Sequence, residues 1–281
     1  MVDNTSNQSV ASEYPTFLRA GISIVTPNKK AFSDSWALWA DIFAAAANSG
    51  ANTSGGLVYH ESSVGACMPI ISTLKDLVAT GDRVLRIEGV FSGTLSFLFN
   101  VFAPADSGAK GGKWSATVAE AKAKGFTEPD PRDDLTGMDV ARKTLILARL
   151  AGLEVQNTAA FPVQSLIPKG LESCKSGEEF MQRLPDYDGE MESIREKAER
   201  EEKVVRFVGS VDVLKKELKV GLETFARDSL IAGLRGADSL FSFYTERYGD
   251  RPLIVQGPGA GGALTAMGVT SDLIKVLERL Q

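Results

Sequence analysis

Near its C-terminal end the chain reads LIVQGPGAGG over residues 253–262, an apolar run followed at once by a glycine-rich turn. Apolar residues then recur with helical spacing up to Leu280, so this region predicts a strand, a tight turn and a helix. The glycines match the G-x-G-x-x-G spacing of dinucleotide-binding loops, but only 19 residues follow Gly262. That is too short for the roughly 30-residue unit which such a loop opens. We therefore favour a close-packed helix entry beside a ligand over a phosphate-binding loop.

The first sixty residues also predict alternating strands and helices, which would form part of an α/β layer. The expected elements are a helix over residues 8–19, a strand over 22–25, a helix over 34–47, a loop by composition over 44–56 and a strand over 57–60. Because a strand, a turn and a helix return at the other end of the chain, we expect residues 22–25 and 253–256 to share one sheet.

Residues 61–250 carry a mixed pattern. We expect helices over residues 69–80, 91–100, 116–124, 136–151 and 190–202, and strands over 84–90, 204–213, 217–224 and 239–247. The predicted fold class is therefore α/β, with a partial Rossmann-like dinucleotide-binding layer in residues 1–60 that resumes in 251–281. An α+β domain, residues 61–250, is inserted between them. Strands 204–213 and 217–224 form a long hairpin with an apolar face, whose edge predicts a homodimer.

Composition excludes several classes of protein. The chain has 281 residues with Lys+Arg 31 against Asp+Glu 36, a net charge of −5, so we expect no nucleic-acid partner. No apolar run approaches the roughly 18 residues that span a bilayer, so we expect no membrane partner. Two cysteines, Cys67 and Cys174, fit a reducing compartment, and the start MVDNTSNQSV does not resemble a signal peptide. These features predict a cytoplasmic protein.

The segment EPDPRDDLTGMDVARK, residues 128–143, is the strongest candidate for chemistry. Asp139 and Lys143 are four residues apart and share one face of the predicted helix, which suits an ordinary ion pair worth a few tenths of a kcal/mol. The same spacing suits a desolvated lysine that exchanges a proton near neutral pH beside carboxylates that orient a polar substrate. Acids before a helix also stabilise its dipole. Spacing alone leaves a structural and a catalytic role open.

Two further segments are candidates for ligand binding. Lys29 follows the predicted strand 22–25, and ligands of open α/β sheets bind outside the carboxyl ends of the strands. The alternative for Lys29 is a solvated lysine at the start of a helix. In residues 61–69 a strand turns into a helix through Gly65, so that several carbonyls and the Glu61 carboxylate predict a weak site for a monovalent cation.

Together these motifs resemble the homoserine dehydrogenase family of the fungal type, over essentially the whole chain. The segments that carry the resemblance are DNTS (3–6), TPNKK (26–30), YHE (59–61), VGA (64–66), IEGVFSGT (87–94), GFTEPDPRDD (125–134), DVARK (139–143) and GPGAG (257–261). The family begins with a strand and a glycine-rich turn that cradle the cofactor pyrophosphate. Nothing before Asp3 resembles them, so we expect the chain to lack that part of the nucleotide-binding domain.

The resemblance implies an oxidoreductase that interconverts L-homoserine and L-aspartate 4-semialdehyde with NADP or NAD, in threonine and methionine biosynthesis. Residues 61–250 would then be the catalytic and dimerisation domain. The matching positions are Lys143 and Lys29 for catalysis, Glu128 and Asp139 for the substrate amino group, Thr5, Lys29 and Gly261 for the cofactor, and Glu61 with the carbonyls of Val64, Ala66 and Met68 for a structural sodium ion. Two alternatives remain: a non-catalytic dimerisation partner of a full-length subunit, and a binder of small molecules in which Lys143 is structural.

Overall fold

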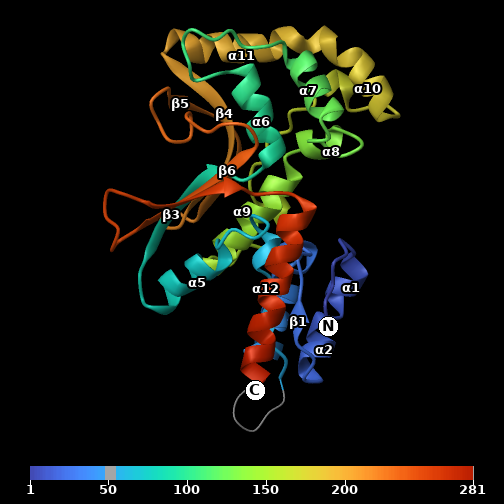
Figure 1. Ribbon diagram of the computed structural model, residues 1–281, viewed down its shortest axis with the longest axis vertical. Coiled ribbons are helices and arrows are strands. Elements are labelled where there is room, and N and C mark those ends of the chain that lie inside the picture. The colour runs from blue at the N-terminus through green and yellow to red at the C-terminus, as the bar shows by residue number, and fades with distance from the viewer. Residues whose placement is uncertain (48–54, 281) are drawn as a thin grey trace.

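A computed structural model describes residues 1–47 and 55–280 of the chain. The elements form two blocks, which lie one above the other in Figure 1. The lower block holds both ends of the chain around a two-stranded parallel sheet, and the upper block is built on a five-stranded sheet. No helix within the described residues combines the length and apolar character that a membrane crossing needs.

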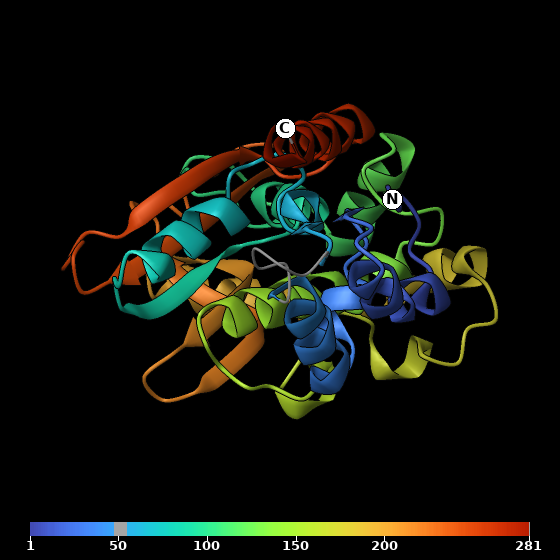
Figure 2. The ribbon, with the colours of Figure 1, turned by 90° about the horizontal axis from the view of Figure 1, so that it is seen from below.

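The lower block is a small α/β layer. Strand β1 (Ile24–Val25) pairs in parallel with β2 (Val58–Tyr59). The helices of this block are α1 (Gln8–Ser12), α2 (Tyr14–Arg19), α3 (Lys30–Ser33), α4 (Trp36–Ala47) and α12 (Gly262–Leu280). Helix α12 packs Val269 and Val276 against Val25 and Tyr59, while α4 lies on the opposite side of the parallel pair in Figure 2. Helices therefore cover the pair on both faces, as parallel strands require.

The upper block is an antiparallel sheet in the order β5-β4-β3-β6-β7. Its strands are β3 (Val84–Val90), β4 (Lys203–Asp212), β5 (Glu217–Ala226), β6 (Asp238–Thr245) and β7 (Leu253–Pro258). The helices around it are α5 (Ile71–Ala79), α6 (Gly93–Phe102), α7 (Trp114–Ala123), α8 (Arg132–Leu135), α9 (Met138–Leu150), α10 (Gly177–Arg183) and α11 (Asp188–Arg200). Short 3-10 turns lie at Glu61–Ser63, Thr158–Ala160, Lys169–Leu171 and Leu184–Tyr187.

Helix α9 joins the two blocks. Its apolar residues belong to one hydrophobic core that runs through both. Near its C-terminal end, the buried Arg149 donates hydrogen bonds to the carbonyls of Phe32 (2.8 Å) and Asp34 (2.7 Å) in the lower block, and to those of Val155 and Gln156. Because one guanidinium donates to carbonyls on both sides, it fixes the segment after β1 against α9.

Most elements lie close to their predicted positions, and β3 covers all of the predicted strand 84–90. One prediction is wrong: residues 22–25 and 253–256 do not share a sheet, because β1 pairs with β2 whereas β7 pairs with β6. Strand β7 pairs with β6 along its whole length, from Pro258 opposite Asp238 to Leu253 opposite Phe243. The backbone of β7 is therefore hydrogen-bonded within the upper block, and of the last two elements α12 alone returns to the lower block. Of the predicted loop 44–56, residues 44–47 belong to α4 and residues 48–54 lie outside the described residues.

Candidate active site

A cavity of about 720 Å³ lies where the two blocks meet. The segment after β1, the beginning of α6, the first turns of α9 and the beginning of α12 contribute to its wall. Charged side chains of both signs line it: Lys29, Lys30, Arg142 and Lys143, against Glu128, Asp133, Asp134 and Asp139. A cavity with balanced charges suits a small polar molecule that carries both an anionic and a cationic group.

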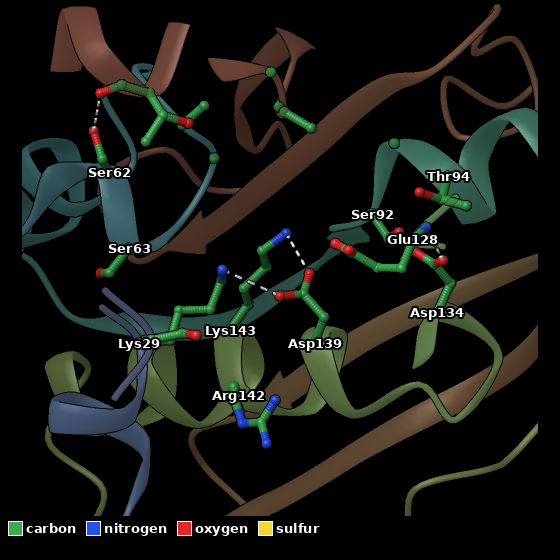
Figure 3. Close-up of a pocket in the computed structure, with 18 of the residues that line it drawn as sticks. Lys29, Ser62, Ser63, Ser92, Thr94, Glu128, Asp134, Asp139, Arg142 and Lys143 are labelled. Atoms are coloured by element: carbon green, nitrogen blue, oxygen red, sulfur yellow. Dashed lines mark hydrogen bonds and ion pairs between the residues drawn. The ribbon is translucent and has the colours of Figure 1, made fainter. Parts of the chain in front are cut away.

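Asp139 lies between two lysines at the centre of this wall (Figure 3). Its Oδ2 is 2.7 Å from Lys143 Nζ, one helical turn further along α9, and its Oδ1 is 3.2 Å from Lys29 Nζ. Lys143 also donates a hydrogen bond of 2.8 Å to the carbonyl of Phe91, and its side chain is only 8% exposed. An ammonium group has three N–H donors, so one remains for a ligand in the cavity.

The surroundings shift the pKa values of this group in opposite directions. Burial lowers the pKa of Lys143 below its ordinary value, Asp139 raises it again, and the charge of Lys29 lowers it. For Asp139, burial raises the pKa, but the two neighbouring ammonium groups outweigh burial and hold the pKa well below its ordinary value. Asp139 is therefore ionised at neutral pH, and the pKa of Lys143 is moved toward the range in which a lysine exchanges protons.

Buried polar residues fix the turn that presents Lys29. The side chain of Asn28 donates a hydrogen bond of 3.1 Å to Asp3, and the hydroxyl of Tyr14 donates to the same carboxylate oxygen. The hydroxyl of Thr26 donates to the carbonyl of Asp3 at 2.7 Å. These bonds fix Thr26 and Asn28, the residues on either side of Pro27. The turn after β1 is therefore held in place, and the side chain of Lys29 points toward Asp139.

The acidic segment brings Glu128 to the other side of the cavity. Its backbone N–H donates a hydrogen bond of 2.8 Å to Asp134 Oδ2, and Glu128 forms no ion pair among the described residues. Burial raises the pKa of Asp134 above its ordinary value, and the charges of Glu128 and Asp139 raise it further. This side of the cavity therefore carries excess negative charge, which favours a cationic group of a ligand.

The glycine turn borders the cavity where α12 begins. Gly259 is packed so closely that a Cβ there would lie 2.5 Å from Ser239 Oγ. At Gly261 the backbone adopts φ +121°, which side chains rarely allow, and a Cβ there would meet nothing within 4 Å. The turn thus combines one close approach, as expected for a close-packed helix entry, with an open backbone surface. The ligand beside it stays a prediction.

Five of the residues predicted for catalysis, substrate or cofactor line this one cavity: Lys29, Glu128, Asp139, Lys143 and Gly261. Thr5 does not; it lies in an adjoining depression that shares Ser6 and Lys30 with the cavity. Sequence reasoning did not single out Ser92, Thr94 or Arg142, which also line it. The signal for the first two is the Ser-Gly-Thr step directly after β3, where the Ser92 side chain caps α6 by accepting the N–H of Leu95.

The predicted cation ligands lie beside this cavity, and only Ala66 lines it. The buried Glu61 carboxylate accepts hydrogen bonds from the backbone N–H groups of Ile71 (2.7 Å) and Ser72 (3.0 Å), so it caps the start of α5. Burial raises the pKa of Glu61. Between Glu61 and α5, Gly65 (φ +78°) and Ala66 (φ +56°) turn the chain sharply.

The chain is similar over its whole length to proteins named homoserine dehydrogenase. The family model described as homoserine dehydrogenase matches residues 69–274, and the model of the NAD binding domain of homoserine dehydrogenase matches residues 1–54. The homoserine dehydrogenase of Paracoccidioides brasiliensis is 67% identical over 282 residues, which cover 100% of this chain and 74% of that protein. The homoserine dehydrogenase of Saccharomyces cerevisiae is 50% identical over 280 residues, with 100% and 76% covered.

Solved structures give the same result for the fold. A Candida auris protein described as being of unknown function has a TM-score of 0.93 and 50% identity, and the match covers 99% of this chain and 76% of that chain. A hyperthermophilic archaeal homoserine dehydrogenase in complex with NADPH has a TM-score of 0.67 and 22% identity, with 99% and 71% covered. At the lower identity the likeness shows a shared fold.

The contact between Asp139 and Lys143 predicts a measurable change in acidity. In the variant Asp139→Asn the pKa of Lys143 falls, because the group that raises it is lost while burial and the charge of Lys29 remain. NMR titration of lysine side chains measures this pKa, with Lys143→Arg identifying the signal. Glu120→Gln, which removes the partner of the surface residue Lys124, is the control and leaves it unchanged. An unchanged or higher pKa in Asp139→Asn contradicts the assignment.

Proposed function

The chain belongs to the homoserine dehydrogenase family, and we propose that its cavity binds L-homoserine and L-aspartate 4-semialdehyde and interconverts them with a nicotinamide cofactor. The observation that carries this proposal is the Asp139 carboxylate shared by Lys143 and Lys29 inside a cavity of mixed charge. It supplies a proton donor, a second positive charge and acidic groups around one small space.

The substrate amino group belongs on the acidic side of the cavity. We assign it to Glu128 and Asp139, of which Glu128 is free of ion pairs among the described residues. Both oxygens of Asp139 already contact ammonium groups, yet a carboxylate offers about four acceptor sites. The substrate ammonium group can therefore be a third cation at Asp139. The substrate oxygen would then lie beside the Lys143 ammonium group.

The residues at the end of β1 and the start of α12 fit a nicotinamide nucleotide. Lys29, Gly261 and the neighbouring Thr5 offer an ammonium, an open backbone and a hydroxyl at one edge of the cavity. This donor set suits a ligand with ribose hydroxyls and negative charge. We assign these residues to NADP or NAD.

When bound, the reduced nicotinamide supplies a hydride to the aldehyde carbon. The oxygen of that aldehyde gains negative charge, and the Lys143 ammonium donates it a proton to complete the alcohol. Asp139 keeps Lys143 charged and oriented before this step, and Lys29 adds a fixed positive charge near the developing alkoxide. In the reverse direction the neutral amine of Lys143 accepts the hydroxyl proton.

We also propose a weak sodium site formed by Glu61 with the carbonyls of Val64, Ala66 and Met68. The sharp turn at Gly65 and Ala66 supports it, because such a turn orients carbonyl oxygens away from regular hydrogen bonding. The Met68 carbonyl accepts one hydrogen bond, from the N–H of Ile70 at 2.8 Å, which leaves a lone pair.

A homodimer through the upper block is part of the proposal. Residues 162–164 cover the middle of the β5 edge, since the N–H of Gln164 donates to the carbonyl of Val220 at 2.9 Å. On the sheet face opposite the main core, Val90, Val208, Ile231, Leu234 and Leu240 form a second, smaller buried cluster. The rest of that face is the surface we assign to a second copy.

The proposed reaction places the chain in the biosynthesis of threonine and methionine. The cytoplasm is the setting we propose for it. Cys67 and Cys174 are free thiols in the structure, which supports a reducing compartment.

The variant Lys143→Ala tests the proton donor. We expect kcat to fall by about 10²–10⁴-fold, the usual contribution of a general acid, while KM changes by less than about threefold. Steady-state kinetics with homoserine and nicotinamide cofactor measures both constants. Lys124→Ala, at a surface lysine paired with Glu120, is the matched control and keeps normal kinetics.

Near-normal turnover of a folded Lys143→Ala protein makes this lysine structural. If the unchanged chain binds no nicotinamide cofactor, the reading as a non-catalytic dimerisation partner is favoured instead.

The sodium site predicts a specific salt effect. The melting temperature is higher in sodium chloride than in tetramethylammonium chloride at the same ionic strength, because a bound ion stabilises only the folded state. Calorimetry measures the difference. Equal melting temperatures in the two salts contradict the site.

The dimer predicts a solution mass of twice the 30.1 kDa chain. Size-exclusion chromatography with light scattering at micromolar concentration measures it. A mass of one chain rejects the homodimer.

A further inference from the structure

Glu128 is carried by a stretch of chain between α7 and α8 that has no regular structure. Two of the hydrogen bonds that hold this stretch lie next to Glu128. The hydroxyl of Thr94, in the first turn of α6, donates to the carbonyl of Phe126 at 2.6 Å, and the N–H of Glu128 donates to Asp134 Oδ2 at 2.8 Å. Figure 3 shows Asp134 and Glu128 beside one another at the same end of the cavity. The second bond acts directly on the residue that carries the carboxylate.

The helix that carries Asp134 is anchored to the rest of the protein. It lies in α8, whose next residue, Leu135, is fully buried in the core. At the start of α8, Arg132 contacts Asp130 and donates a hydrogen bond of 2.6 Å to the carbonyl of Cys174. A short helix of four residues is thus tied to the protein on both sides of Asp134, so its carboxylate is a fixed acceptor.

We propose that Asp134 is a positioning residue, which fixes Glu128 so that its carboxylate meets the ammonium group of an amino-acid substrate; this rests on the proposed function. An exposed glutamate on an irregular segment loses conformational freedom when it binds a ligand, and a backbone bond made beforehand reduces that cost. The negative charge of Asp134 also adds to the attraction for a cation. Both effects favour the ammonium group of the ligand over its uncharged and anionic groups.

Two ligands separate this role from a general structural one. L-homoserine carries the ammonium group, whereas 4-hydroxybutanoate has the same carboxylate and hydroxyl without it. In Asp134→Ala we expect homoserine to bind about tenfold more weakly, the loss of one hydrogen bond to a charged group. Binding of 4-hydroxybutanoate stays within about twofold of the unchanged chain. Isothermal titration calorimetry measures both affinities without any need for turnover.

Two further variants sharpen the measurement. Asp134→Asn keeps an oxygen that accepts the N–H of Glu128 but loses the charge, so its loss of homoserine affinity is smaller than that of Asp134→Ala. Asp106→Ala is the matched control, because Asp106 also accepts a backbone N–H, that of Gly108 at 2.9 Å, in an exposed loop away from the cavity. We expect Asp106→Ala to bind both ligands as the unchanged chain does.

The outcomes are distinct. If the unchanged chain does not bind homoserine, the proposed function fails, and the role of Asp134 with it. If it binds, but Asp134→Ala weakens both ligands equally or neither, the proposed function stands and the positioning role is overturned. Should Asp134→Ala not fold, Asp134→Asn decides: a loss confined to homoserine supports the role, and equal behaviour toward both ligands rejects it.

Discussion

The site depends on one carboxylate that two lysines share. An ammonium group as buried as that of Lys143 is costly unless an opposite charge and hydrogen-bond acceptors surround it. Asp139 provides the charge from one turn earlier on α9, and the carbonyl of Phe91 provides a second acceptor. These two contacts hold the lysine in place, while burial still leaves its pKa below the ordinary value. A lowered pKa is the property that a proton donor near neutral pH needs.

This arrangement requires the two blocks to meet in one geometry, since Lys29 comes from the lower block and Asp139 from α9. Helix α9 contacts the segment after β1 near the beginning of the helix and again near its end. At the beginning, Asp139 contacts Lys29 at 3.2 Å, and near the end Arg149 donates to the carbonyl of Phe32 at 2.8 Å. The same helix therefore carries Lys143 and, through Asp139 and Arg149, fixes the segment that presents Lys29.

Local patterns predicted much of this architecture, because most helices and strands depend on periodicity that is visible within each segment. The acidic segment and Lys143 were recognisable as a candidate site from spacing and chemistry. The partner of β7 was not, since the sequence does not show which sheet edge a strand joins. The role of Glu61 as a cap was also hidden, because its partners, the N–H groups of Ile71 and Ser72, lie ten or more residues away. The bond from Glu128 to Asp134 likewise depends on how an irregular segment folds back.

The central claim is that the acidity of the amine at position 143 governs proton transfer. The most direct measurement replaces Lys143 by a lysine analogue of lower pKa: Lys143→Cys, in a chain with Cys67 and Cys174 changed to Ser, is alkylated with 2-bromoethylamine. Aldehyde reduction needs the charged amine, so its rate falls as pH rises through that pKa. The account predicts that alkylation restores turnover and that this alkaline fall occurs at lower pH than with lysine. Restored turnover with an unmoved pH profile, or full turnover before alkylation, contradicts it.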